Sequence, residues 1–105
     1  MSRHDELRLA DIRDAADKIA LLVARGRPAL DEDIAVLPAL ERLIYIISEA
    51  ASTLSDEAMA QYCTAPWREI KGMRVILAHQ YHRVDPNLIW ETAATHVPAL
   101  RRVVA

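Results

Sequence analysis

The chain has 105 residues, a size that fits one small domain, residues 1–105, around one hydrophobic core. Apolar residues make up 52% and charged residues 27%, which excludes a disordered tail, and the net charge of -2 argues against a general nucleic-acid coat. Only 2 glycines and no phenylalanine occur, so the composition favours helices over a turn-rich sheet.

The first predicted element is a helix from about Asp5 to Arg25. Its apolar residues recur at steps of three and four and form one stripe: Leu9, Ile12, Ala16, Ile19 and Val23. Gly26 and Pro28 end this helix, because glycine suits the position past the last turn and proline cannot continue a helix.

The second long helix is expected from roughly Pro38 to Leu54. Before it, the acidic run 31–33 resembles the first turn of a helix that Pro38 should break or restart. The apolar seam of the long helix comprises Leu37, Leu40, Ile44, Ile47, Ala51 and Leu54. Leu43, Ile46 and Ala50 widen its apolar surface. Either this helix is central in a bundle, or its second face meets another subunit.

Three further segments complete the helical pattern. Ser55 can cap a short helix through Cys63, and Pro66 starts a long segment that carries Gly72, where a kink or a close approach of another backbone is expected. The last helix opens at Asp85 and Pro86, and Pro98 should kink or restart it. The whole pattern predicts an all-α fold, an antiparallel bundle of four to five helices.

The charges are unevenly distributed along the chain. Residues 1–60 carry 7 Lys/Arg against 12 Asp/Glu, whereas residues 61–105 carry 6 against 3. A local basic zone in an acidic protein suits a focused phosphate site.

The single cysteine, Cys63, excludes an internal disulfide and is read as a small, half-buried residue in a reducing compartment. The charged start of the chain and its short apolar runs predict a soluble, cytoplasmic protein.

The segment 74–81 is the strongest candidate for chemistry. Arg74 offers a planar set of donors for phosphate oxygens, His79 can exchange protons near neutral pH, and Tyr81 adds a phenol. Arg74 and His79 are five residues apart, so on one straight helix they point about 140° away from each other. Two copies related by a twofold axis could bring them into one cleft, which makes a homodimer part of the hypothesis. From spacing alone, a hydrogen-bonded structural histidine and an arginine that only reaches solvent remain open.

Several short motifs resemble the HepT-like family of the HEPN superfamily. They are Pro66-Trp67-Arg68-Glu69-Ile70, then Gly72-Met73-Arg74, His79 with Tyr81, Val84-Asp85 and Trp90-Glu91-Thr92. Upstream, residues 47–51 followed by Leu54 resemble the family's IGEAA…L helix, with Ser48 in place of glycine. The resemblance covers about residues 11–100.

The resemblance implies a small helical homodimer, the ribonuclease toxin of a type VII toxin–antitoxin pair. By position, Arg74 and His79 would be the catalytic residues of a metal-independent endoribonuclease that needs no cofactor. The partner would be an MntA-like minimal nucleotidyltransferase antitoxin that attaches AMP to Tyr81. Adding AMP there would place bulk and negative charge close to Arg74.

The roles of the other basic residues are open, and three departures from the family pattern leave a second function open. Arg68 and Lys71 are candidate phosphate contacts or ordinary surface cations, and His82 and Arg83 are candidate RNA contacts or solvated loop. Departures from the family pattern are Val75 for a polar residue, Gln80 for glutamate, and residues 82–83 for Phe-Gly. The alternative function is therefore a catalytically degenerate HEPN module that binds nucleotide, RNA or the partner.

Overall fold

A computed structural model describes residues 1–79 and 85–105 of the chain. Its helices are α1 (Arg3–Val23), α2 (Ala29–Glu32), α3 (Val36–Ser52), α4 (Asp56–Gln61), α5 (Trp67–His79), α6 (Pro86–Glu91), the π-helical turn η1 (Thr92–His96) and α7 (Val97–Val103). No strand occurs in these two ranges, and the predicted all-α fold is confirmed. None of their helices is both long and apolar enough to cross a bilayer.

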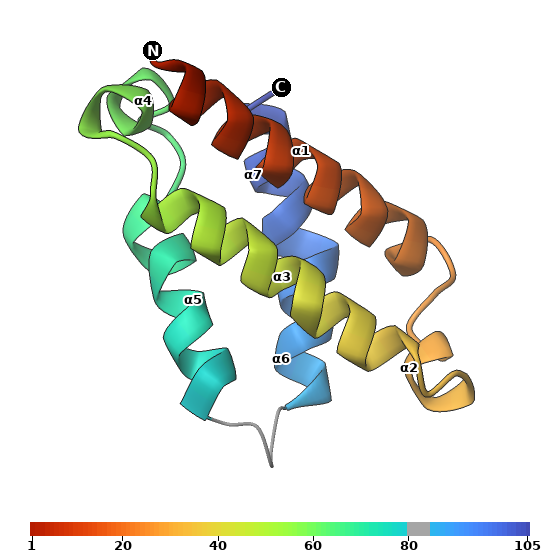
Figure 1. The fold of residues 1–105 in the computed structure, drawn as a ribbon. Coiled ribbons are helices and arrows are strands. Elements are labelled where there is room, and N and C mark those ends of the chain that lie inside the picture. The colour runs from red at the N-terminus through yellow and green to blue at the C-terminus, as the bar shows by residue number, and fades with distance from the viewer. Residues whose placement is uncertain (80–84) are drawn as a thin grey trace.

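Helix α3 occupies the centre of the bundle (Figure 1). It packs against α1 on one side and α5 on the other, while α6 also contacts it and α7 packs against α1. The partly buried Leu43 and Ile46 pack against the core, so the prediction of a central position for this helix is confirmed. The largest fully buried apolar side chains are Leu9, Ile12, Ile19, Val36, Leu40, Ile44, Ile47 and Val104.

The caps of α1 and α4 meet at one carboxylate. Ser2 caps α1, so this helix begins at Arg3 rather than at Asp5. The buried Asp5 accepts hydrogen bonds from the backbone N–H of Ser55 at 2.9 Å and from its hydroxyl at 2.7 Å. Ser55 in turn caps α4, as predicted, by accepting from the N–H of Ala58 at 3.1 Å. Asp5 therefore ties together the starts of two helices.

The ends of the predicted elements differ in places from the structure. Helix α4 ends at Gln61, and the expectation of a half-buried Cys63 is wrong, because this residue is exposed. Residues 31–32 lie in the first turn of the short helix α2, as expected for an acidic run. Asp33 follows them and accepts a hydrogen bond from the N–H of Ala35 at 2.9 Å, just before α3.

The two prolines in the long helices are accommodated differently. Helix α3 begins at Val36 and runs through Pro38, which lies in its first turn, where a backbone N–H would have no helical partner. In the last helical segment, the π-helical turn η1 ends at His96, and α-helix resumes at Val97 next to Pro98. The wider π turn relieves the clash of a proline ring with the preceding turn, so the expected restart at Pro98 is confirmed.

Candidate functional site

The Arg74 side chain lies across α3 and remains about half exposed. Its Nη1 atom donates to Oε2 of Glu49 at 3.2 Å and to the hydroxyl oxygen of Ser52 at 3.4 Å. The side chain is 43% exposed, so its remaining donors can reach a ligand. Two side chains of α3 thus hold this guanidinium at the surface.

The backbone of Arg74 is held by the same helix. The fully buried Ser48 hydroxyl accepts a hydrogen bond from the backbone N–H of Arg74 at 3.0 Å and donates to the carbonyl of Lys71 at 3.1 Å. A serine here lets the two helices approach closely and joins their backbones through one hydroxyl group. The position of Arg74 along α5 is therefore set by α3.

Ser48, Glu49 and Ser52 are not among the site residues predicted from the sequence. A signal was present, because these polar residues follow directly after the apolar run 43–47 and would share one side of the helix at spacings of one and four. The meaning of this pattern depends on the helix that packs against these residues, and the structure shows that this helix is α5.

Gly72 was expected to allow a kink or the close approach of another backbone, and the structure shows open space beside it. Helix α5 continues through it, and a Cβ atom added at Gly72 would meet nothing within 4 Å. The expected close backbone approach at this glycine is wrong within the described chain, since Ser48 mediates the contact between α3 and α5 instead.

The structure places only part of the predicted catalytic segment. His79 is the last residue of α5, so it shares that helix with Arg74, but its side chain and that of Val75 lie outside the described residues. Gln80, Tyr81, His82 and Arg83 also lie outside them. For these residues, the roles assigned from the sequence stay predictions.

The two other candidate phosphate contacts lie on α5 at intervals of three residues before Arg74. Arg68 is exposed and Lys71 is partly exposed. Residues at this spacing are neighbours on a helix surface, so both cations extend the basic character of α5 away from Arg74.

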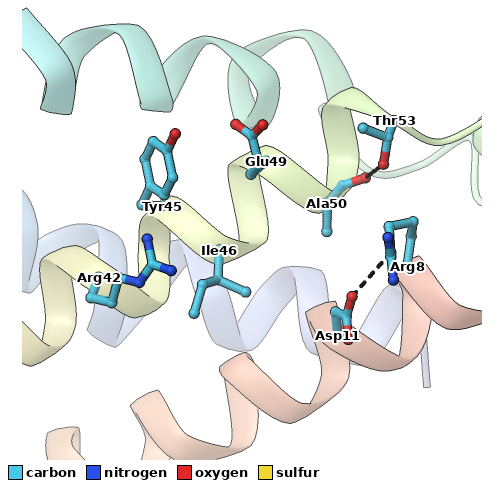
Figure 2. Close-up of a pocket in the computed structure, with 8 residues that line it drawn as sticks. All are labelled: Arg8, Asp11, Arg42, Tyr45, Ile46, Glu49, Ala50 and Thr53. Carbon is cyan, nitrogen blue, oxygen red and sulfur yellow. Dashed lines mark hydrogen bonds and ion pairs between the residues drawn. The ribbon is translucent and has the colours of Figure 1, made fainter.

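Glu49 is also one of the residues that line a polar groove (Figure 2). The groove lies between α1 and α3 and has a volume of about 310 Å³. Glu49 lines this groove and also binds Arg74, so the two features share one carboxylate. In the described ranges, no group of three His, Cys, Asp or Glu residues is arranged to hold a metal ion.

The family and the relatives that match this chain carry ribonuclease names. Residues 12–105 match the family described as "Ribonuclease HepT-like". A protein of Caldanaerobacter subterraneus subsp. tengcongensis, named "Putative RNase", is 37% identical over 87 residues, which cover 79% of this chain and 78% of that protein. The "Probable ribonuclease HepT" of Thermococcus cleftensis is 32% identical over 98 residues, which cover 86% of each chain.

A "Putative RNase" of Methanocaldococcus jannaschii is 34% identical over 66 residues, and the match spans 61% of that protein. No solved structure matches the chain. Because the family match covers most of the sequence, the resemblance read from the motifs around Arg74 is confirmed: this chain belongs to the ribonuclease HepT-like family.

Proposed function

We propose that the chain is a metal-independent endoribonuclease whose active sites form between two identical subunits. The observation that carries this proposal is the anchoring of Arg74, whose backbone is held by Ser48 and whose guanidinium is held at the surface by Glu49 and Ser52. A fixed, partly exposed guanidinium is suited to stabilise charge that develops on a phosphate group. Membership of a ribonuclease family supports RNA as the substrate.

The proposed chemistry needs one cation and one acid–base group. The ribose 2′-hydroxyl oxygen bonds to phosphorus as the bond from phosphorus to the 5′ oxygen breaks. His79 assists by taking the hydroxyl proton or by protonating the leaving oxygen, and water takes or supplies the other proton. Arg74 stabilises the negative charge on the phosphate oxygens during this exchange.

The proposal requires a dimer because of the helix geometry. Arg74 and His79 both lie on α5, and their five-residue separation turns them about 140° apart. A twofold axis beside α5 would pair Arg74 of each subunit with the partner's His79.

Cleavage of RNA in the presence of a chelator tests the catalytic roles. We expect the parent protein to cleave total RNA, and Arg74→Ala and His79→Ala to lose about 100-fold or more of the rate. Arg102→Ala removes an exposed cation on α7 and serves as the matched control, with unchanged cleavage expected. Helical circular dichroism spectra must match, so that lost activity is not lost folding. Full activity in either Arg74→Ala or His79→Ala would refute the assignment.

The second part of the proposal concerns control of this activity. Tyr81 follows His79 by two residues and is proposed as the acceptor of AMP from a partner nucleotidyltransferase. Its phenolic oxygen would attack the α-phosphorus of ATP and release pyrophosphate. The added phosphate would then compete with RNA for Arg74. In this toxin–antitoxin arrangement, both proteins act in the cytoplasm.

Intact-mass measurement after co-expression with such a partner tests Tyr81. The expected result is a mass gain of whole AMP units in the parent protein and none in Tyr81→Phe. Tyr45→Phe and Tyr62→Phe are the matched controls and should be modified like the parent. Modification that persists in Tyr81→Phe would reject this residue as the acceptor.

The second candidate function is a binding module without catalysis. Val75 and Gln80 favour it, because they remove a polar group and a charge that the family pattern carries near the catalytic pair. This candidate predicts RNA binding without cleavage in the same assay, and cleavage by the parent protein would exclude it.

A further inference from the structure

The groove between α1 and α3 has the chemistry of a nucleotide-binding site. One guanidinium comes from each helix, Arg8 from α1 and Arg42 from α3, and Tyr45 stands beside Arg42 (Figure 2). The Arg42 guanidinium carbon lies 5.6 Å from the centre of the Tyr45 ring. Tyrosine rings and arginine planes are the surfaces on which proteins stack single-stranded RNA bases.

The groove is also bounded by groups that can accept hydrogen bonds. Asp11 and Glu49 contribute carboxylates, and Thr53 contributes a hydroxyl near the end of α3. Such groups can pair with a base amino group or a ribose hydroxyl. Ile46 and Ala50 provide apolar lining between the polar rims. The volume of about 310 Å³ is small for a ligand pocket and suits one nucleotide rather than a larger ligand.

The ion pairs of the groove leave it able to bind an anion. Arg8 Nε lies 3.0 Å from Asp11 Oδ2, yet this buried nitrogen makes no aligned hydrogen bond within the described chain. Arg42 is exposed and forms no ion pair with a residue in the described ranges. Glu49 is paired with Arg74, which does not line the groove, and Asp11 is paired with Arg8, so Arg42 is the guanidinium of the groove that remains available to a phosphodiester within the described chain.

The position of the groove connects it to Arg74. Glu49 lines the groove and accepts a hydrogen bond from Arg74 Nη1 at 3.2 Å, so a nucleotide in the groove would lie near the cation assigned to the scissile phosphate. We infer that this groove binds one nucleotide of single-stranded RNA adjacent to the cleavage position, with its base against Tyr45 and its phosphate at Arg42 and Arg8. The inference rests on the proposed ribonuclease function and adds a substrate-positioning site to it.

Steady-state cleavage of a short single-stranded RNA tests the site by separating KM from kcat. Tyr45→Leu and Arg42→Ala should each raise KM about tenfold, since one stacked base or one phosphate contact is lost, and leave kcat nearly unchanged. Tyr45→Phe keeps the ring and should retain the parent KM. Arg102→Ala removes a cation of the same kind from α7 and should also have no effect. An unchanged KM in both Tyr45→Leu and Arg42→Ala would overturn the inference.

A binding experiment keeps the inference testable if the parent protein does not cleave RNA. A fluorescent 2′-O-methyl oligonucleotide lacks the reactive hydroxyl group, so its anisotropy reports binding alone. The same two variants should weaken this binding about tenfold even if the proposed catalysis fails. Titration with AMP alone tests whether the groove binds a free nucleotide instead of RNA. Tight AMP binding that depends on Tyr45, together with unchanged oligonucleotide binding in Tyr45→Leu, would reject the RNA site.

Discussion

At the scale of single residues, polar contacts from three side chains of α3 decide where Arg74 can act. Ser48 holds its amide group, while Glu49 and Ser52 hold its guanidinium. All three belong to α3, although Arg74 belongs to α5. The family resemblance identified Arg74 as a candidate, but the groups that position it come from a helix distant in the sequence.

Substitution of Ser48 should show how much this anchoring contributes. Ser48→Ala loses both hydrogen bonds of a buried hydroxyl and should lower the free energy of unfolding by about 1–3 kcal/mol. Because the backbone of Arg74 loses its hydrogen bond to α3, the guanidinium is positioned less precisely, and kcat for RNA cleavage should fall about tenfold with little change in KM. Urea unfolding and steady-state kinetics measure the two effects.

Thr95→Ala, on an exposed position of η1, is the control for Ser48→Ala and should change neither quantity. If Ser48→Ala cleaves RNA with the parent kcat, the hydroxyl is only a packing feature.

At the scale of elements, Asp5 links α1 to α4. Hydrogen bonds from the Ser55 backbone and hydroxyl, helped by Ser2, lower its pKa from 3.8 to about 2 in spite of its burial. A depressed pKa in the folded state means that the ionised carboxylate stabilises the fold. This stabilisation is fully present above pH 3.8 and is lost as the pH falls toward about 2.

Removal of this carboxylate should alter the dependence of stability on pH. Asp5→Asn should lower the melting temperature at pH 7 and flatten its decline between neutral pH and about pH 2. Asp31→Asn changes an exposed carboxylate on α2 and should retain the parent profile. Thermal unfolding followed by circular dichroism over this range makes the comparison. A decline for Asp5→Asn as steep as that of the parent would contradict the role of Asp5.

At the scale of the whole molecule, the proposed active site extends beyond one subunit. Arg74 is partly exposed beside the central helix α3, and His79 ends the same helix as Arg74. If each site takes one group from each subunit, two inactive variants should complement one another.

Mixing of variants tests this arrangement directly. Arg74→Ala and His79→Ala, unfolded and refolded together, should recover about a quarter of the parent activity, because half of the dimers then carry one intact site. Each variant refolded alone should remain inactive, and light scattering should give the mass of two chains. A protein that is monomeric while active, or a mixture with no recovered activity, would rule out the composite site.

The sequence by itself determined the fold class, the main helices and the family. Apolar residues at spacings of three and four, and caps such as Ser55 and Asp85, are local signals that require no knowledge of the partner helix. The start of α1 was also readable, since Ser2 and Asp5 have the spacing of a capping box, but this signal was missed.

Only the tertiary structure decided which residues surround Arg74. Ser48 and Arg74 are 26 positions apart, and their contact depends on how α3 and α5 pack and in which register. The same packing decides that Ser48, not Gly72, mediates the approach of the two helices. The groove of Arg8, Arg42 and Tyr45 likewise arises where α1 lies beside α3. Contacts of this kind depend on side chains from different helices, so no pattern along one helix could reveal them.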